Sequence, residues 1–281
     1  MNLMFKRKLL CSATTLLLSG VVHAESSHFD RLPIQLIGPL SHAQQDLGWR
    51  MGLGIGVESE SEYAGSKNTA TEADLYFEAG YRTERLDFRS GIVDNRLFYQ
   101  LTPNIYTVTW VNFEEGREES EFDSLSGLGD IDDSIEIGGG VSWLASDNFG
   151  FTFAAQTYTS GSPDKGAVFF LATHYRLFES DNLRLDAIAD ISYGNADHLQ
   201  TEFGITEAQS ANSVYDEYKI DSGVKSYGLG LASVYQYSDN IYVAGSVSFE
   251  KYGSDVSDSP LVKAGSDTEE EISLGVIYRF F

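Results

Sequence analysis

The chain has 281 residues with 42 acidic and 19 basic side chains, which gives a formal net charge of −23 at pH 7. This charge argues against nucleic-acid binding, which needs cationic side chains to neutralise phosphates, and against simple electrostatic docking on an anionic membrane. Divalent cations, polycations or basic protein surfaces are the compatible partners. The mean hydropathy of −0.20 suits a soluble protein, so the periodicity of the apolar residues has to decide the class.

The first residues have the pattern of a secretory signal peptide. Three basic residues at 6–8 precede an apolar stretch over 9–22, and Ala24 ends a small-residue cleavage motif. The apolar stretch is too short to cross a membrane as a helix. The sequence therefore predicts a signal peptide over residues 1–24, cleaved after Ala24. Cys11 is the single cysteine and lies inside this segment, so we expect no disulfide in the mature chain.

Residues 25–47 show no clear period, and we interpret them as a periplasmic N-terminal lead. From residue 48 onward, apolar residues alternate with other residues, as the two faces of a β-strand require. In the first alternating segment the apolar face comprises Trp49, Met51, Leu53, Ile55 and Val57. The opposite face is mostly glycine, which permits close approach and strong bending in a barrel wall.

Twelve alternating segments follow one another, joined in turn by short and long connections. Three short connections are the same tripeptide, Ser-Asp-Asn, whose side chains favour turns. Short turns at one end and long loops at the other are typical of outer-membrane barrels. The sequence predicts an all-β fold over residues 48–281, a closed antiparallel transmembrane β-barrel with both termini in the periplasm. The predicted strands cover residues 48–58, 70–81, 85–92, 96–101, 104–113, 133–144, 149–158, 166–178, 183–193, 223–237, 241–252 and 269–281.

Two alternatives to this architecture stay open. The segment 96–101 is the weakest strand, and a barrel without it and its neighbour would have about ten strands. A soluble sandwich or lipocalin-like barrel would show similar alternation, but its apolar faces would point inward. The direction of the apolar faces separates these classes.

The last predicted strand ends on aromatic residues. Its apolar face runs from Ile272 to Phe280, and Tyr278, Phe280 and Phe281 close the chain, with Phe281 one residue beyond the usual terminal position. This ending resembles the terminal strand of bacterial outer-membrane barrels, which implies that the barrel assembly machinery recognises these aromatic residues. Together with the signal peptide, it predicts a location in the bacterial outer membrane, in contact with lipid and lipopolysaccharide.

An acidic connection over residues 114–133 is the one candidate metal site. Asp130, Asp132 and Asp133 could converge on a hard cation such as calcium, although their spacing does not match an EF-hand loop. The alternative is a solvated external loop in which Asp130 and Asp132 order the turn through side-chain-to-backbone hydrogen bonds. The spacing favours this second interpretation.

The long connection over residues 194–222 contains a helix signal. Thr206 and Gln209 have the spacing of a capping box, and the acidic Glu207 favours the first turn of a helix. The sequence predicts a short helix over residues 207–213. Such a helix could shape an external lid or fold into the barrel mouth.

Enzymatic chemistry has little support. A serine hydrolase needs a base, normally histidine, beside its nucleophile, and four histidines remain after the predicted cleavage. His198 could pair with Asp197 or Asp190, but a lone loop histidine is most often solvated. No cluster of cysteine and histidine offers a transition-metal site. We therefore expect no catalytic residue, no cofactor and no enzymatic activity.

Charged residues also fall on the inward face of the predicted strands. We expect them to form ion pairs in the lumen, with the lining of a small pore as the alternative. These residues are Arg50, Asp87, Arg89, Arg184, Asp186 and Asp190.

Two loop motifs carry a family resemblance. The first is Gly127-Leu128-Gly129-Asp130-Ile131-Asp132-Asp133 after Gly116-Arg117, and the second is Phe203-Gly204-Ile205-Thr206-Glu207-Ala208-Gln209-Ser210-Ala211. Together with the glycine-rich first strand and Tyr63-x-Gly65-Ser66, these motifs resemble the MipA/OmpV family of outer-membrane proteins. The family often has proline where this chain has Glu207.

The resemblance implies an outer-membrane barrel that serves as an interaction or scaffold protein. In the family's named member, this scaffold links a lytic transglycosylase, which degrades murein, to a penicillin-binding murein synthase. A narrow channel for small solutes or cations is the alternative function, with the acidic loop as a collecting funnel. An outer-membrane hydrolase centred on His198 is the third and weakest hypothesis.

Overall fold

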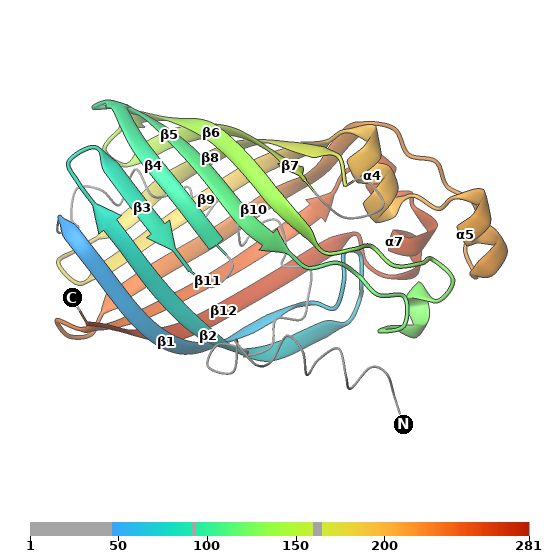
Figure 1. The fold of residues 1–281 in the computed structure, drawn as a ribbon, viewed down its shortest axis with the longest axis horizontal. Coiled ribbons are helices and arrows are strands. Elements are labelled where there is room, and N and C mark those ends of the chain that lie inside the picture. The colour runs from blue at the N-terminus through green and yellow to red at the C-terminus, as the bar shows by residue number, and fades with distance from the viewer. Residues whose placement is uncertain (1–46, 92–93, 160–164, 281) are drawn as a thin grey trace.

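The computed structural model describes residues 47–91, 94–159 and 165–280. The predicted signal peptide, the lead up to residue 46 and Phe281 lie outside the described residues. Twelve antiparallel strands of the described chain close into one barrel, in which β1 pairs with both β2 and β12 (Figure 1). The predicted strand number is therefore confirmed, and the ten-strand alternative is wrong.

The strands match the alternating segments of the sequence closely. Their bounds are β1 (Gly48–Ser61), β2 (Thr69–Arg82), β3 (Leu86–Ser90), β4 (Asp94–Thr102), β5 (Ile105–Glu114), β6 (Ser134–Ser146), β7 (Phe149–Tyr158), β8 (Ala167–Glu179), β9 (Leu183–Gly194), β10 (Gly223–Gln236), β11 (Ile241–Tyr252) and β12 (Thr268–Arg279).

The apolar face of each strand points outward. Exposed fractions reach 66% for Ile55, 59% for Phe153 and 62% for Leu229, because these side chains leave the barrel wall at every second position. A soluble barrel or sandwich would bury this face, whereas a transmembrane barrel presents it to lipid. The soluble alternative is therefore wrong, and the apolar belt suits a bilayer.

One side of the lumen is filled by a hydrophobic cluster. The strands β4 to β8 contribute inward side chains that are almost fully buried, namely Phe98, Val108, Trp110, Ala154, Val168 and Phe170. Trp110 lies against Gly138, where an added Cβ would come within 2.0 Å of the indole ring. Its Nε1 donates to Glu136 Oε1 at 2.7 Å, which satisfies the buried indole. This half of the barrel is therefore packed with large side chains.

The two ends of the barrel differ. The terminal end is where β1 begins and β12 ends, and five short turns of the described chain lie there, such as the one between β6 and β7 (Figure 1). The loop end carries the long connections and the helices (Figure 1). The helical elements are η2 (Asp123–Leu125), α4 (Ala196–Phe203), α5 (Glu207–Asn212), α6 (Ser254–Ser257) and α7 (Pro260–Ala264).

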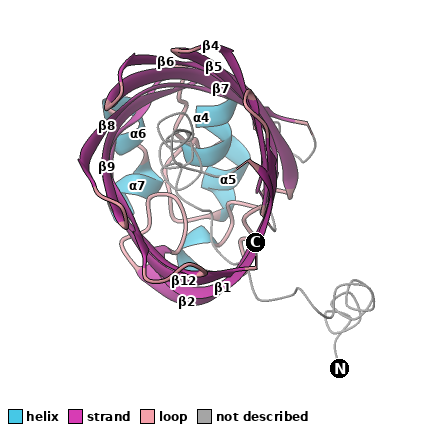
Figure 2. Ribbon diagram, turned by 90° about the vertical axis from the view of Figure 1, so that its left-hand side faces the viewer, coloured by secondary structure: helices cyan, strands magenta, loops and turns pink. Residues whose placement is uncertain are grey.

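The helices at the loop end overlap the barrel opening when the molecule is viewed along its axis (Figure 2). The predicted helix over residues 207–213 is confirmed as α5, whereas α4, α6 and α7 were not predicted. In the described part of the chain, no helix is both long and apolar enough to cross a membrane.

Candidate functional site

Four connections at the loop end pack together into one unit, which we call the cap. It comprises residues 62–68, 115–133, 195–222 and 253–267, and it contains two hydrophobic clusters. The first cluster consists of Tyr63, Leu125, Leu128, Ile205, Tyr215 and Leu261. The second consists of Leu199, Phe203, Ile220, Tyr252, Val256 and Val262. The cap therefore has cores of its own above the barrel wall.

Tyrosine hydroxyls tie the first cluster to η2. Tyr63 donates to Ser124 Oγ at 2.7 Å, and Tyr215 donates to the carbonyl oxygen of Ser124 at 2.9 Å. Burial raises the pKa of Tyr215, and the neighbouring Tyr63 adds to the shift, so the phenol stays protonated and available as a donor. Tyr63 and Tyr215, which are far apart in the sequence, therefore both hydrogen-bond to Ser124.

The first family-motif loop is ordered by its own carboxylates. Glu119 Oε2 accepts from the amides of Gly127 and Gly129, each at 2.9 Å. Both glycines have positive φ, 85° and 76°, which side chains rarely adopt. In return, Asp130 Oδ1 accepts from the amide of Glu119 at 2.8 Å. The glycines and acids of the motif therefore form one folded loop.

The metal candidates fall within this loop. Asp130 and Asp133 each use Oδ1 to accept a backbone amide, from Glu119 and Gly116 respectively. Asp132 lies between them, beside Ile131, whose backbone pairs with Arg117 through two hydrogen bonds. Across the described residues, no three acidic, histidine or cysteine side chains are placed to hold a metal ion.

The second family-motif loop has the predicted capping box. Thr206 caps α5 by accepting from the amide of Gln209 at 3.3 Å, while Gln209 Oε1 accepts from the amide of Thr206 at 2.8 Å. The amide of Ser210 continues the helix by donating to the carbonyl oxygen of Thr206. Upstream, Phe203 is fully buried against Tyr252, and Gly204 ends α4.

The two motif loops contact each other. Gln209 Nε2 donates to the carbonyl oxygen of Leu128, and Gly127 packs against Asn212, where an added Cβ would lie 2.1 Å from the carbonyl oxygen. In the same region Arg117 is 95% buried and its Nη1 donates to the carbonyl oxygen of Glu202 at 3.4 Å. The motifs recognised in the sequence therefore form one interface inside the cap.

The expectation that His198 is solvated is wrong. It lies in α4, which Asn195 caps, and only 1% of its surface is exposed. Its ring stacks on Tyr158 at 6.0 Å between centroids, and Nδ1 lies 3.0 Å from the carbonyl oxygen of Lys165. The unpredicted helix α4 carries the histidine into the barrel mouth, where it is packed against Tyr158.

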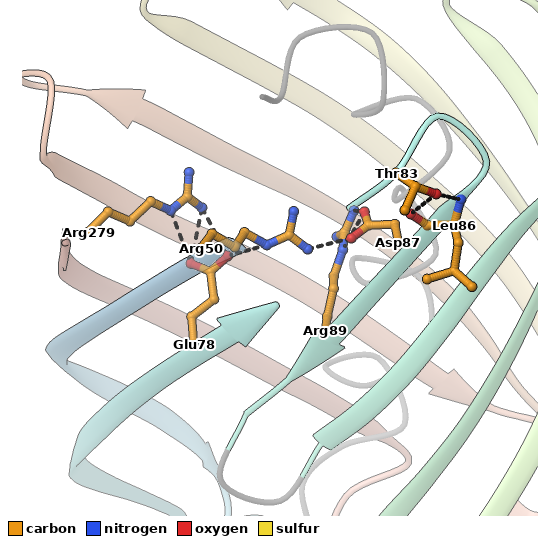
Figure 3. A network of polar contacts seen from close by, with 7 residues as sticks. All are labelled: Arg50, Glu78, Thr83, Leu86, Asp87, Arg89 and Arg279. Atoms are coloured by element: carbon orange, nitrogen blue, oxygen red, sulfur yellow. Dashed lines mark hydrogen bonds and ion pairs between the residues drawn. The ribbon is translucent and has the colours of Figure 1, made fainter. Parts of the chain in front are cut away.

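At the terminal end, arginines and carboxylates of four neighbouring strands pair along the inner wall of the barrel. Asp87 is 1% exposed and accepts from Arg50 at 2.6 Å and from Arg89 at 2.8 Å (Figure 3). Glu78 pairs with Arg50 at 3.2 Å and with Arg279 at 3.1 Å (Figure 3). The predicted inward direction of Arg50, Asp87 and Arg89 is confirmed, and the network braces β1, β2, β3 and β12.

A second group of ion pairs lies on the opposite wall. Asp186 accepts from Arg176 Nε at 2.6 Å and lies 3.0 Å from Arg184 Nε, while Arg176 also pairs with Glu179 at 3.0 Å. The expectation that Arg184 and Asp186 form ion pairs in the lumen is confirmed. Asp190, by contrast, joins no ion pair within the described part of the chain.

Four members of these networks were missed in the sequence, namely Glu78, Arg176, Glu179 and Arg279. Glu78, Arg176 and Arg279 lie on the inward phase of their strands, so the alternation could have found them, whereas Glu179 follows a register shift in β8. Among the described residues at the terminal end of the lumen, these networks and the buried Arg82 contribute six arginines against four carboxylates. This end is therefore cationic within a strongly acidic chain.

The aromatic ending keeps its predicted phase. Tyr278 and Phe280 lie on the outward face, about half exposed, with ring centroids 5.3 Å apart. The amide of Phe280 donates to the carbonyl oxygen of Met51 at 2.8 Å, which extends the pairing of β12 with β1. The role of these residues as an assembly signal stays a prediction.

The chain is similar to several known barrels. One curated relative, the "24 kDa outer membrane protein" of Pasteurella multocida, is 26% identical over 239 residues, which is 81% of this chain and 90% of the relative. Among solved structures, the toluene transporter TodX of Pseudomonas putida covers 86% of this chain and 91% of its own, with 10% identity and a TM-score of 0.43. The NanC porin covers 81% and 98%, with 9% identity and a TM-score of 0.42.

A family model gives a more specific result. The model described as "MltA-interacting protein MipA" matches residues 53–280, from the first strand to the aromatic ending. Both motif loops of the cap lie inside this range. The chain therefore belongs to the MipA family, as its loop motifs indicated.

Proposed function

We propose that this chain is a non-enzymatic outer-membrane barrel that serves as an interaction protein for murein enzymes. The observation that carries the proposal is the match of residues 53–280 to a family named for its interaction with MltA. The chemistry of the partner is that of a murein-degrading lytic transglycosylase, and the barrel links it to a murein synthase. The Pasteurella relative, named as an outer membrane protein, supports the location.

We place the terminal end in the periplasm and the cap outside the cell. Short turns face the periplasm and long loops face outward in bacterial barrels, and this barrel has that asymmetry. The cap and the ion pairs on the inner wall both hold parts of the barrel together, which suits an anchor. The periplasmic surface is then made of short turns, the only described part that a cell-wall enzyme reaches.

Three of these turns present the same charge. Asp147, Asp181 and Asp239 each occupy the centre of a Ser-Asp-Asn turn and are exposed. A partner with a basic face would be attracted by this repeated acidic feature, mainly through faster association. The turns are therefore the first place to test for contact.

The test is a binding assay with the purified full-length chain in detergent and a purified lytic transglycosylase. We expect Asp147→Lys/Asp181→Lys/Asp239→Lys to weaken binding at least tenfold. The matched control reverses three exposed acids of the cap, Asp216→Lys/Glu217→Lys/Asp221→Lys, and should bind as the natural chain does. Absence of binding by the natural chain, or equal loss in both variants, would contradict the proposal.

A narrow channel is the second candidate. The observation in its favour is that the lumen wall of β9 to β12 carries small inward side chains and leaves open volume, unlike the wall of β4 to β8. Single-channel conductance in planar bilayers tests it. Steps that fall after neutralisation of Glu114, Glu115, Glu118 and Glu119 would support a cation channel, and a silent barrel would remove this candidate.

A further inference from the structure

A cavity of about 150 Å³ lies in the lumen on the β9 to β12 side. We call it the lumen hollow. The strand register places its floor in two rows, because Val234, Ala244 and Gly275 are aligned across three strands and Ala232, Ser246 and Ser273 are aligned beside them. None of these six residues has a side chain larger than that of valine, so the floor is low and the hollow stays open.

The walls of the hollow have different chemistry. Tyr76 and Ile277 form one wall, and Arg184 and Asp186 form the other. Tyr76 can lie close to the barrel wall because its neighbours are glycines: a Cβ on Gly56 or on Gly275 would come within 2.5 Å and 2.7 Å of its ring. The glycine-rich first strand therefore seats an aromatic wall for the hollow.

Arg184 has donor capacity that the protein does not use. Its Nε lies 3.0 Å from Asp186 Oδ2, which is close enough for an ion pair. The geometry does not meet that of a hydrogen bond, and Nε makes no hydrogen bond to any other described residue. Asp186 Oδ1 also accepts from Arg176 Nε at 2.6 Å, so the positive charge of Arg176 already balances the negative charge of Asp186. A guanidinium has five N–H donors in a planar fork, and the four on its terminal nitrogens are left for a ligand.

The floor supplies a second polar group. Ser246 and Ser273 lie with their hydroxyl oxygens 2.5 Å apart, so one hydroxyl donates to the other. Two hydroxyls carry two protons and their mutual bond uses one, which leaves one O–H to donate into the hollow. Both polar groups therefore offer donors, beside aliphatic and aromatic surface.

We propose that the lumen hollow binds one small carboxylate with a compact apolar body. The carboxylate accepts from the terminal nitrogens of Arg184, and the body lies on Ala232 and Val234 against the ring of Tyr76. Arginine forks match carboxylates in geometry, and a cavity of about 150 Å³ holds a single benzene ring. The excess of arginines at the terminal end favours an anion there, although the whole chain carries a charge of −23.

This site is independent of the proposed interaction with murein enzymes, because it lies inside the lumen and uses none of the exposed turns. The experiment uses the full-length chain in detergent, with benzoate as the probe and benzyl alcohol as its neutral counterpart. Ligand-observed saturation-transfer NMR and calorimetry measure binding at pH 7. We expect benzoate to bind and benzyl alcohol to bind at least tenfold more weakly.

Variants locate the site. Arg184→Gln should weaken benzoate binding at least tenfold, while Arg85→Gln, which removes the same charge from an exposed turn, should leave it unchanged. Ala244→Leu should block binding of both probes, because the larger side chain fills the floor of the hollow without changing any charge. Electrophoretic migration of unheated and heated samples shows whether each variant has folded, since closed barrels migrate differently before heating.

Three outcomes overturn the proposal. The first is that the natural chain does not bind benzoate at millimolar concentration. The second is equal binding of benzoate and benzyl alcohol, which would remove the carboxylate from the ligand class. The third is unchanged binding in a folded Ala244→Leu variant, which places the ligand elsewhere, and this variant decides the matter even if Arg184→Gln does not fold.

Discussion

Gln209 donates a hydrogen bond from Nε2 to the carbonyl oxygen of Leu128, a residue 81 positions earlier in the chain. This single contact joins the two loops that carry the family motifs. The same side chain closes the capping box of α5 through Oε1. One glutamine therefore links a local helix signal to the tertiary structure of the cap.

The substitution Gln209→Ala should loosen the cap and leave the barrel intact. It removes half of the capping box and the contact with Leu128, at a cost of about 1–2 kcal/mol. We expect amide hydrogen exchange in residues 115–133 and 206–213 to become about 5–30-fold faster, with unchanged exchange in the strands. The control Glu207→Ala keeps the capping box, and an equal effect there would contradict the assigned role.

Glu119 should order the first motif loop because its carboxylate oxygen accepts hydrogen bonds, and not because the carboxylate is negatively charged. Its Oε2 accepts from both Gly127 and Gly129, whereas Glu121 is an exposed acid of the same loop. We expect Glu119→Ala to expose the loop to protease, with a loss of about 1–3 kcal/mol in its local stability. Glu119→Gln keeps an acceptor oxygen and should cost less.

Limited proteolysis in detergent checks this order, with Glu121→Ala as the control that should remain resistant. If Glu119→Gln opens the loop as fully as Glu119→Ala, the negative charge matters more than the hydrogen-bond acceptor. If neither variant is cleaved faster, the loop does not depend on Glu119.

The barrel was predictable because its signal is local. Alternation needs only neighbouring residues, so the segments 149–158 and 241–252 coincide with β7 and β11 in full. Where alternation breaks, the sequence misleads. A register shift between Arg176 and Phe178 turns both Leu177 and Phe178 outward, each about half exposed, so the phase of the end of β8 could not be derived from period 2 alone.

The cap was less predictable, because its structure depends on distant contacts. The helix α5 was found through its capping box, but α6 and α7 have four and five residues, too few for a periodic pattern. The burial of His198 depends on Tyr158 and Lys165, which are far from it in sequence. The motif residues could be named from the sequence, and their mutual contact could not.

The glycine at position 275 should be required for the position of Tyr76. A Cβ there would lie 2.7 Å from the Tyr76 ring, and the other nearby atoms also belong to that ring. We expect Gly275→Ala to reduce the free energy of unfolding by about 1–3 kcal/mol. Gly139→Ala is the matched control, because its added Cβ meets nothing closer than 3.4 Å, and it should change stability by about 0.5 kcal/mol or less.

Urea unfolding of the detergent-refolded chain measures both changes, and Tyr76→Ala supplies a double-mutant cycle. If the ring is the obstacle, Gly275→Ala should cost at least about 1 kcal/mol less when Tyr76 is already alanine. Additive costs would show that the alanine disturbs the strand pairing of β11 and β12 instead.

The two carboxylates of the terminal network should differ in their importance. Asp87 is 1% exposed and accepts from two arginines, so Asp87→Asn removes a buried charge and leaves Arg50, itself only 11% exposed, without its shortest ion pair. We expect a loss of about 3 kcal/mol in the free energy of unfolding. The pair of Arg279 with Glu78 is about one-quarter exposed on both sides, so Arg279→Gln should cost only about 1 kcal/mol or less.

The exposed turn residue Glu84 gives the control, Glu84→Gln, with no expected change. Urea unfolding followed by tryptophan fluorescence ranks the three variants. Equal losses for Asp87→Asn and Arg279→Gln would mean that water reaches both pairs alike, and that the terminal end of the lumen is open and not braced by its ion pairs.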